Sequence, residues 1–329
     1  MKRLIAFSVR PDELGFIQNW AKTHPEIEID THRRALTADN AEMVKGYDGV
    51  SILGAPAGRD VLTALKENGI QYVASRSIGY DNIDIEAVQE LGLHVSNVEY
   101  SPGSVAEYTL MLILMSLRKA KTIMRRADIQ DFSLIGSHGR ELRNLTVGII
   151  GTGRIGLRLA QYLTGFGCRV IGYDPYPNED AHDLVEYVTF NELLGQADVI
   201  TLHTPSTDDN YHLLDADAFA RMKDEVVIVN CSRGELIHSD ALIGALEEGK
   251  VSAAALDVVE GDEPIFHRDW RNQPVVNKQL QILRSFPNVT VTPHIAFYTL
   301  DVVNEMVTCA LESMTQFWET GTSDREITK

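Results

Sequence analysis

The chain has 329 residues, which exceeds one ordinary hydrophobic core and predicts two domains. Its apolar fraction of 44% is that of a globular protein, and its formal net charge of −17 disfavours a nucleic-acid partner, because phosphate binding depends on Lys and Arg. Three distant cysteines indicate neither a disulfide framework nor a zinc site, and the apolar runs are too short for a signal peptide or a membrane span, so we expect a cytoplasmic protein.

Five short β-type runs occupy about the first hundred residues and alternate with amphipathic helical patterns. Such alternation is typical of a parallel α/β fold, so this part of the chain is predicted to form one small, doubly wound domain. The expected strands are residues 2–9, 27–31, 48–53, 71–77 and 93–98.

Residues 102–127 are predicted to form one long helix. Ser101 can cap its start, Pro102 suits the first helical position, and basic residues gather at the far end, where the helix dipole favours them. The apolar face of this segment is broad, which indicates burial between domains or subunits.

A second set of strands follows, and its nearly continuous apolar runs are typical of parallel strands that are buried on both faces. Residues 301–321 have an apolar helical pattern but no strand of their own, so this helix is expected to pack back on the first domain, which would then be discontinuous. The second set of strands is expected at residues 145–151, 168–174, 197–203, 225–231, 251–258 and 288–293.

The stretch "VGIIGTGRIG" places Gly151, Gly153 and Gly156 as GxGxxG directly between a strand and a helix. Glycines at this spacing permit a tight turn and let a pyrophosphate approach the helix N-terminus. The motif alone could be an ordinary glycine-rich turn, but the next strand ends at Asp174, where a carboxylate would hold a ribose 2′-hydroxyl. Pro and Tyr follow Asp174, with no adjacent Arg for a 2′-phosphate, so the sequence predicts NAD rather than NADP.

Two further side chains stand at strand ends, where ligands of such folds bind. Arg233, in "NCSRGELI", could fork the carboxylate of a 2-oxo acid and polarise its carbonyl, or it could be an ion-paired surface residue. His294, in "TPHIAFYT", could protonate that carbonyl as a hydride arrives, or it could be a satisfied core histidine. His203, in "LHTP", is similarly placed and illustrates the core alternative.

The stretch "LDVVEGDEPIF" carries four carboxylates, those of Asp257, Glu260, Asp262 and Glu263. It lacks the D-x-D-x-D-G spacing of an EF-hand, so a metal site is disfavoured. The stretch follows the strand that precedes the strand ending at His294, so one of its carboxylates could orient that imidazole and support its charged form. Glu260 is expected to face solvent.

These motifs together resemble the D-isomer-specific 2-hydroxyacid dehydrogenase family, in particular its D-lactate dehydrogenase branch, and most of all the enzymes of that branch associated with vancomycin resistance. The similarity runs nearly end to end and is carried by "RSIGYDNID", "NVEYSPGSVAEYTLMLILM", "LTVGIIGTGRIG", "LHTPSTDDNYHLL", "NCSRGELI", "AALDVVEG" and "VTPHIAFYT". The resemblance implies a homodimer, D stereochemistry and two Rossmann-like, doubly wound domains with the active site in the cleft between them. It divides the chain into a flavodoxin-like substrate domain, residues 1–100 plus 297–329, and an NAD-binding domain, residues 101–296.

The resemblance also implies roles for single residues. It makes Arg233 the substrate-binding arginine and His294 the acid–base histidine. For the substrate it implies the backbone groups of Ile78 and Gly79, which would receive the carboxylate, and Tyr100. For the coenzyme it implies the glycine-loop residues Arg154 and Ile155, the ribose carboxylate Asp174, and contacts from Thr204, Pro205, Asn210, Cys231, Ser232, Arg233 and Asp257.

Two positions are distinctive within this resemblance. The family's partner of the histidine is a glutamate, where this chain has Asp262, one methylene shorter, followed by Glu263. We favour Asp262 as the partner and keep Glu263 as the alternative. Leu53 falls near the position where lactate-preferring relatives carry a tyrosine, so a wider pocket for branched or aromatic 2-oxo acids is expected.

The sequence thus predicts an NAD-dependent D-2-hydroxyacid dehydrogenase that reduces 2-oxo acids such as pyruvate, phenylpyruvate or 2-oxoisocaproate with NADH. The alternative is an NAD-sensing corepressor of the same fold, which is disfavoured because long disordered tails and basic character are lacking. Phosphoglycerate dehydrogenase is disfavoured because no C-terminal regulatory domain is expected. Formate dehydrogenase is disfavoured because a resemblance to that enzyme would imply a glutamine at the position of the carboxylate that partners the histidine.

Overall fold

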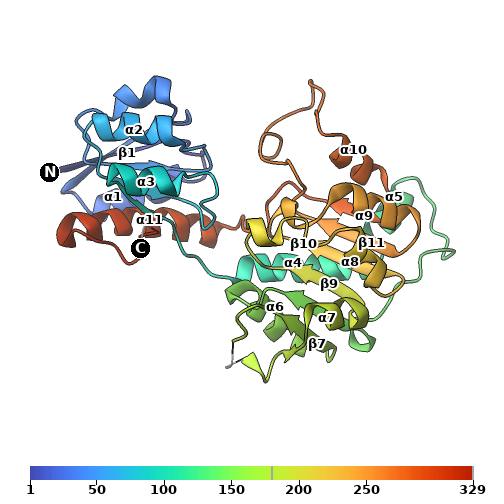
Figure 1. Cartoon of the computed structure of the whole chain (residues 1–329). Coiled ribbons are helices and arrows are strands. Elements are labelled where there is room, and N and C mark those ends of the chain that lie inside the picture. The colour runs from blue at the N-terminus through green and yellow to red at the C-terminus, as the bar shows by residue number, and fades with distance from the viewer. Residues whose placement is uncertain (179–180, 328–329) are drawn as a thin grey trace. The chain divides into compact units, whose positions relative to one another are not determined.

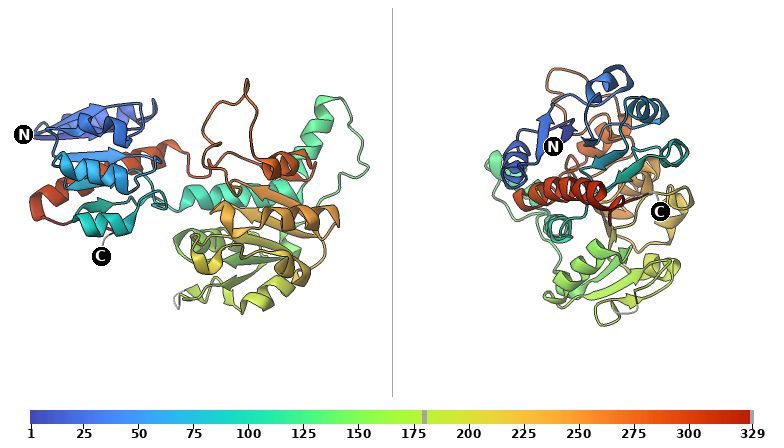
Figure 2. Two further views of the ribbon diagram at one scale, coloured as in Figure 1. Left: turned by 45° about the horizontal axis from the view of Figure 1, so that its top comes forward. Right: turned by 90° about the vertical axis from the view of Figure 1, so that its left-hand side faces the viewer.

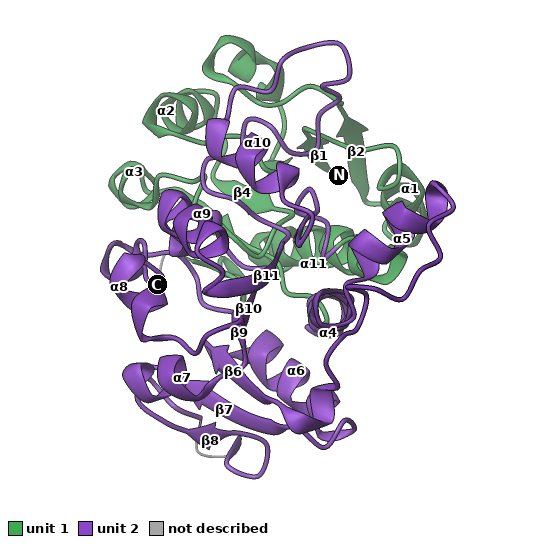
Figure 3. Ribbon diagram, turned by 90° about the vertical axis from the view of Figure 1, so that its right-hand side faces the viewer, with its two compact units in different colours: residues 1–101, 298–329 green, residues 102–297 purple. Residues whose placement is uncertain are grey.

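A computed structural model of the chain describes residues 1–178 and 181–327. The chain folds into two compact units, the first formed by residues 1–101 with 298–329 and the second by residues 102–297 (Figure 3). The two boundaries between the units, after residues 101 and 297, each lie one residue beyond the boundary expected from the sequence. Each unit is built on a fully parallel sheet, which confirms the predicted fold class.

The sheet of the first unit has its strands in the order β2-β1-β3-β4-β5, so the strand order reverses between β1 and β3. All the strands predicted here are confirmed, most of them with narrower bounds. They are β1 (Lys2–Ala6), β2 (Ile27–Thr31), β3 (Gly49–Ile52), β4 (Tyr72–Ser75) and β5 (His94–Ser96). Their connections contain α1 (Leu14–Thr23), the 3-10 helix η1 (Ala38–Val44), α2 (Arg59–Glu67) and α3 (Ile85–Leu91).

The C-terminal helix α11 (Leu300–Thr320) packs against β3 and β4 of this first sheet. Figure 3 shows α1 and α11 on one side of the sheet and α2 and α3 on the other, and Figures 1 and 2 give further views of these elements. The approach of α11 requires glycine at position 49, because a Cβ there would lie 2.3 Å from the Sδ atom of Met314. The C-terminal segment is therefore part of the first unit.

The prediction of one helix over residues 102–127 is wrong, since the chain forms α4 (Gly103–Leu117) and α5 (Ala120–Asp128). The helices are separated at Lys119, whose φ of 53° is left-handed. Beyond the break, the side chain of Lys121 donates to two backbone carbonyls of the segment that leads into the last strand. Hydrogen bonds to distant parts of the chain thus outweigh a continuous helical pattern.

The sheet of the second unit has the order β12-β11-β10-β9-β6-β7-β8. All the strands predicted here are confirmed, whereas the short edge strand β8 was not predicted. The strands are β6 (Thr146–Ile150), β7 (Arg169–Tyr173), β8 (Glu186–Tyr187), β9 (Val199–Leu202), β10 (Val226–Asn230), β11 (Val251–Leu256) and β12 (Val289–Val291). The helices are α6 (Arg154–Thr164), α7 (Phe190–Gln196), α8 (Ala216–Arg221), α9 (Ser239–Glu247) and α10 (Lys278–Ser285), with the 3-10 turns η2 (Leu142–Asn144), η4 (Asp208–Asn210) and η5 (Gly234–Leu236).

Helices cover both faces of this second sheet and create two hydrophobic cores. The helices α4 and α6 pack on one face and α7 to α10 on the other, as Figure 3 shows. Successive side chains of a strand point to opposite faces, so Ile149 joins the core under α4 and its neighbour Ile150 joins the other core. This explains the continuous apolar runs of the central strands. The strand order reverses between β6 and β9, where ligands bind in this architecture.

Of the helices in residues 1–178 and 181–327, none has the length and apolar character that crossing a membrane requires.

Candidate active site

The glycine-rich turn between β6 and α6 is tightly packed at two glycines and open at the third. A Cβ on Gly151, whose φ is 92°, would lie 2.6 Å from the backbone of His203, and a Cβ on Gly156 would lie 2.1 Å from the Gly151 carbonyl oxygen. Gly153, in contrast, has no other atom within 4 Å of an added Cβ. The backbone at the start of α6 therefore borders open space, which fits a pyrophosphate bound by helix N–H groups.

Asp174, directly after β7, is hydrogen-bonded to this glycine turn. Its carboxylate accepts from the N–H and the hydroxyl of Thr152 at 2.7 and 3.2 Å, and from the N–H of Tyr176 at 2.9 Å. Arg154 and Ile155 follow in the first turn of α6. A carboxylate thus lies beside the open start of α6, where it can accept a hydrogen bond from a ribose hydroxyl.

The loops after β9 and β10 are hydrogen-bonded to each other. The hydroxyl of Ser232 donates to the carbonyl of Thr204 at 2.5 Å. Within the first loop, the amide of Asn210 donates to the carbonyl of Pro205 at 2.8 Å and accepts from the N–H of Thr207 at 2.7 Å. Four predicted coenzyme contacts therefore lie on two connected loops at the carboxyl edge of the sheet.

Arg233 lies in the loop after β10, and the buried Asn230 fixes the conformation of that loop. The Asn230 side chain donates to the carbonyl of Arg233 at 2.7 Å and accepts from the N–H of Ser232 at 2.9 Å. Burial and the charge of Asp257 raise the pKa of the Cys231 thiol, so this thiol stays protonated at neutral pH. Asn230 was missed in the sequence, although an amide at the end of an otherwise apolar strand is a recognisable signal.

Asp257, at the end of β11, holds the loop that carries His294. Its buried carboxylate accepts from the hydroxyl of Thr292 at 2.5 Å and from the N–H groups of Ile295 and Ala296 at 3.0 and 2.8 Å. The N–H of His294 donates to the backbone carbonyl of Asp257 at 2.7 Å. Because His294 has a left-handed φ of 53°, these bonds hold a backbone conformation that histidine adopts only at a cost.

The imidazole of His294 is neutral at neutral pH. Burial lowers its pKa to about 4, the positive charges of Arg233 and His267 lower it too, and the carboxylate of Asp257 raises it. His267 lies close by, with its Nε2 atom 2.9 Å from the carbonyl oxygen of His294. Arg233 and Asp257 therefore both act electrostatically on His294.

His203 differs from His294 in its surroundings. Its Nε2 atom lies 2.9 Å from the hydroxyl of Thr201, and burial lowers its pKa to about 4. No charged neighbour contributes to that shift within the described residues. These surroundings favour the core alternative for His203, whose side chain is half-buried.

Asp262 lies in the loop after β11, but its hydrogen bond is local. The carboxylate accepts from the N–H of Val259 at 2.8 Å, and the contacts found for residues 1–178 and 181–327 do not join it to His294. Burial raises the pKa of Asp262 to about 7, and neighbouring carboxylates, including that of the exposed Glu263, raise it too. The carboxylate that raises the pKa of His294 in this structure is Asp257.

The expectation that Glu260 faces solvent is wrong. Its half-buried carboxylate lies 2.7 Å from Nε2 of His212 and accepts a hydrogen bond from the hydroxyl of Tyr211 at 3.1 Å. Burial pushes the pKa of Glu260 upward, but the hydrogen bonds from His212 and Tyr211 outweigh burial and hold it below its ordinary value. No group of three or more His, Cys, Asp or Glu side chains in the described part of the chain could hold a metal ion.

In the first unit, Ile78 and Gly79 form a turn after β4. The side chain of Asn97 donates to the carbonyl of Ile78 at 2.8 Å, and the hydroxyl of Ser77 donates to the carbonyl of Gly79 at 2.8 Å. No hydrogen bond to the N–H of Ile78 or Gly79 is found within residues 1–178 and 181–327. Two N–H groups on a fixed turn can bind a carboxylate. Tyr100 is half-buried and follows β5 in the same unit.

Arg76 precedes this turn and was missed in the sequence. Its buried guanidinium donates to the carboxylate of Glu13 at 2.9 Å, to the hydroxyl of Ser51 at 2.8 Å and to the carbonyl of Phe7 at 2.7 Å. These bonds connect the carboxyl ends of β1, β3 and β4, where the half-buried Leu53 also lies. The sequence feature that could have revealed Arg76 is a charged residue at the end of a buried strand, in "RSIGYDNID".

Known proteins match this chain along nearly its whole length. The family model described as "D-isomer specific 2-hydroxyacid dehydrogenase, NAD binding domain" matches residues 110–296. The chain is 43% identical to an aromatic 2-oxoacid reductase of Clostridium sporogenes, over 97% of each protein. The chain belongs to the D-isomer-specific 2-hydroxyacid dehydrogenase family.

Further relatives place this D-2-hydroxyacid dehydrogenase in the D-lactate dehydrogenase branch. It is 42% identical to a D-lactate dehydrogenase of Lactiplantibacillus plantarum, over 99% of each protein. The crystal structure of a D-lactate dehydrogenase from Treponema pallidum matches it with a TM-score of 0.90 at 35% identity, over 99% of each chain.

The dehydrogenase is thus an NAD-dependent oxidoreductase, which confirms the predicted cofactor and reaction class. The open glycine turn and the carboxylate of Asp174 fit that coenzyme. The names of the relatives favour an enzyme over the corepressor-like alternative.

Proposed function

We propose that this dehydrogenase reduces bulky 2-oxo acids, aromatic or branched, to D-2-hydroxy acids with NADH. The observation that carries the proposal is the loop anchored by Asp257, which holds His294 within the electrostatic influence of Arg233. The preference for bulky substrates is supported by the aliphatic Leu53 and by the identity with an aromatic 2-oxoacid reductase.

NADH, when bound, supplies the hydride. We assign its pyrophosphate to the turn containing Gly153, because that glycine borders open space at the start of α6. The carboxylate of Asp174 would accept a hydrogen bond from a ribose hydroxyl. The other coenzyme contacts are assigned to Gly151, Arg154, Ile155, Gly156, Thr204, Pro205, Asn210, Cys231, Ser232, Arg233 and Asp257.

The substrate carboxylate would be bound by Arg233 of the second unit and by the N–H groups of Ile78 and Gly79 of the first. A guanidinium matches a carboxylate with two parallel hydrogen bonds, and it also stabilises negative charge on the neighbouring carbonyl oxygen. Tyr100 would contact the substrate from the first unit.

His294 would donate the proton that the carbonyl oxygen acquires during reduction. Its pKa of about 4 makes it a poor proton carrier at neutral pH until the anionic substrate arrives and offsets the charge of Arg233. Asp262, with its pKa raised to about 7, can hold a proton at neutral pH and is the proposed partner of His294. Glu263 remains the alternative partner.

The partner assignment is tested with Asp262→Asn and Glu263→Gln. We expect Asp262→Asn to lower turnover and move the apparent pKa of the pH–rate profile, because the carboxylate proposed to partner the proton donor is lost. Glu263→Gln should leave the profile close to that of the unmodified enzyme. A displaced profile for Glu263→Gln alone would reassign the role to Glu263.

The reaction itself is tested by following the absorbance of NADH with phenylpyruvate, 2-oxoisocaproate and pyruvate, and by chiral analysis of the products. We expect the highest kcat/KM with phenylpyruvate or 2-oxoisocaproate, and D products. Leu53→Tyr should shift the preference toward pyruvate by about tenfold, since added aromatic volume excludes large side chains. No turnover of any 2-oxo acid would refute the proposal, and a preference for pyruvate would refute the part concerning Leu53.

We also propose that the enzyme is a homodimer located in the cytoplasm, where NADH is available. A set of apolar side chains from the second unit is exposed, and a second copy would cover it. The set consists of Met124, Ile129, Phe132, Leu134 and Ile135, of which Leu134 is 88% exposed. Light scattering during gel filtration should give twice the chain mass, and Phe132→Ser combined with Leu134→Ser should reduce it.

A further inference from the structure

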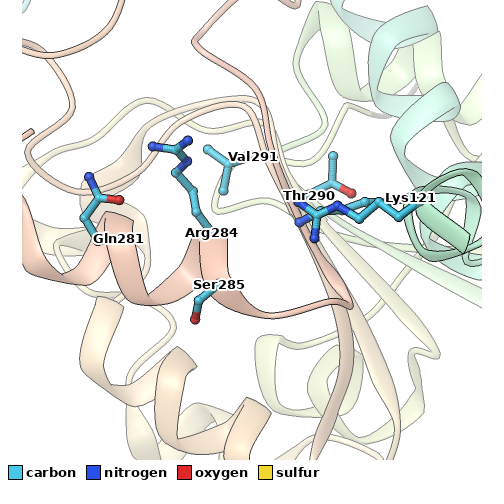
Figure 4. A pocket seen from close by; sticks show the side chains of 7 residues that line it. Lys121, Gln281, Arg284, Ser285, Thr290 and Val291 are labelled. Carbon is cyan, nitrogen blue, oxygen red and sulfur yellow. The ribbon is translucent and has the colours of Figure 1, made fainter. Parts of the chain in front are cut away.

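A basic pocket lies in the second unit, between α5, α10 and β12. Its volume is about 590 Å³, and it is open to solvent. Figure 4 shows Gln281 and Arg284 extending from α10 on one side and Lys121 approaching from the other. The lining consists of Lys121, Arg125, Gln281, Arg284, Ser285, Thr290 and Val291.

The charge of this lining is entirely positive, although the chain as a whole has a net charge of −17. Three of the lining residues are Lys or Arg, none is Asp or Glu, and the others are polar or aliphatic. The side chains of Arg125 and Arg284 make no hydrogen bond or ion pair with any residue of the ranges 1–178 and 181–327. Both guanidiniums therefore have their donors available for a ligand.

The third cation is held in place by the protein backbone. The Nζ atom of Lys121 donates to the carbonyl of Phe286 at 3.3 Å and also to the carbonyl of Val289. Burial lowers the pKa of Lys121, and the charges of Arg125 and Arg284 lower it too. The three cations are thus close enough to repel one another, and a bound anion would relieve that repulsion.

The geometry points to a binding site for a small polyanion, either a phosphate ester or a polycarboxylate, in the pocket between Lys121, Arg125 and Arg284. Guanidiniums bind both kinds of group with parallel hydrogen bonds, and Thr290 adds a hydroxyl donor, whereas the hydroxyl of Ser285 already donates to the carbonyl of Ile282 at 2.6 Å. The volume exceeds what a single phosphate needs and admits a ligand of several carbon atoms.

This site is separate from the coenzyme site. Its strand, β12, is at one edge of the sheet, and β11, β10 and β9 lie between it and β6, which leads into the glycine turn. None of the seven lining residues is among those that we assign to NADH or to the 2-oxo acid. The inference therefore stands independently of the proposed substrate.

The test is calorimetric titration of the full-length protein at low ionic strength, in the presence of saturating NADH. NADH occupies the coenzyme phosphate site, so that added anions report on other sites. The two probes are citrate and fructose 1,6-bisphosphate, which separate the polycarboxylate from the phosphate ester. The test variant is Arg125→Gln with Arg284→Gln, which keeps Lys121 and its bonds to the backbone.

We expect at least one probe to bind, and the double substitution to weaken that binding by about tenfold or more, since two charge-assisted contacts are lost. The control variant is Arg221→Gln, which removes an exposed Arg on α8, outside the pocket. This variant should bind the probes as the unmodified protein does. Unchanged NADH-dependent turnover would establish that the double variant is folded.

Two results would overturn the inference. The first is that neither probe binds the unmodified protein; if the double substitution then also changes the oligomeric state, the pocket is a contact surface for a second copy. The second is that binding survives the double substitution, which would place the anion elsewhere, for instance at Arg233.

Discussion

Asp257 and His294 are joined through both the main chain and the side chain of the aspartate. The carbonyl of Asp257 accepts from the N–H of His294 at 2.7 Å, and its carboxylate accepts from the N–H groups of the two residues that follow His294. One buried carboxylate thus fixes the position of the proposed proton donor and also raises its pKa.

Asp257→Asn should therefore affect both position and charge. An amide cannot accept every hydrogen bond that the carboxylate accepts, so we expect kcat to fall by about 100-fold and the free energy of unfolding to fall by roughly 2–4 kcal/mol. Loss of the negative charge should lower the pKa of His294 further, which moves the pH–rate profile in the acidic direction. Urea denaturation and a pH series of turnover measure the two effects.

The control for this substitution is Asp269→Asn, because Asp269 is exposed and pairs only with the neighbouring Arg271 among the described residues. It should change neither turnover nor stability by a measurable amount. A variant Asp257→Asn with lower stability but an unmoved pH profile would show that Asp257 has a structural role alone.

Much of the fold could be predicted because its signals are local. Each central strand is a buried apolar run, and the glycines of the β6–α6 turn include two positions, Gly151 and Gly156, where a Cβ would clash with backbone atoms. What could not be predicted depends on contacts between distant residues. The break at Lys119 accompanies bonds from α5 to the segment before β12, and Glu260 finds its partners at positions 211 and 212.

The candidate site shows the same limit. Residue type and strand-end position made Arg233 and His294 candidates, since ligands bind at the carboxyl edge of a parallel sheet, and the family resemblance then selected them over the surface and core alternatives. The positioning residues Asn230 and Arg76 were missed because their roles appear only once the loops are folded around them. The order of the acidic run likewise did not reveal that Asp262 bonds to its own loop.

Asp262 should oppose folding at neutral and alkaline pH. Its pKa is about 7 in the folded chain against an ordinary value of 3.8, so the folded state binds this proton more tightly than the unfolded state. Its contribution to stability is therefore most favourable below about pH 4 and is lost as the pH rises to about 7. We expect Asp262→Asn to be more stable than the unmodified protein by about 2 kcal/mol at pH 8, and equally stable near pH 4.

His294 has the opposite dependence, because its pKa is lowered to about 4 from 6.5 and the folded state binds that proton more weakly. Its contribution is lost as the pH falls from about 6.5 to about 4, so the two slopes oppose each other in the unmodified protein. Asp262→Asn should reveal a stability that rises with pH through this window, as measured by urea denaturation. The same rise in the exposed control Glu263→Gln would refute the assignment to Asp262.

Arg233→Gln should separate substrate binding from coenzyme binding. We expect kcat/KM for the 2-oxo acid to fall by about 100-fold or more, since a charge-assisted pair of hydrogen bonds is lost, while NADH fluorescence titration is little changed. Because the charge of Arg233 lowers the pKa of His294, its removal should raise that pKa toward the ordinary value. Nuclear magnetic resonance titration of the His294 ring checks the second effect, and an unmoved ring pKa would contradict it.

Single and double substitutions of the buried pair Arg76 and Glu13 should differ strongly in how much they lower the free energy of unfolding. Glu13→Gln leaves the guanidinium of Arg76 buried without a counter-charge, so we expect a loss of roughly 3–5 kcal/mol in the free energy of unfolding. Glu13→Leu combined with Arg76→Met should cost less than Glu13→Gln, because no uncompensated charge remains. Urea denaturation of both variants decides this, and equal or greater loss in the double variant would contradict it.

Asp174 should determine the choice between NADH and NADPH. Its carboxylate lies beside the glycine turn through its bonds to Thr152, and it would repel the phosphate that distinguishes NADPH. Asp174→Ala should therefore lower the ratio of kcat/KM for NADH to that for NADPH by about tenfold or more, through weaker NADH binding and reduced repulsion of NADPH. Asp208→Ala, which removes an exposed carboxylate from η4, is the matched control and should leave the ratio unchanged. An unchanged ratio in Asp174→Ala would mean that this carboxylate supports only the glycine turn and that the coenzyme choice is made elsewhere.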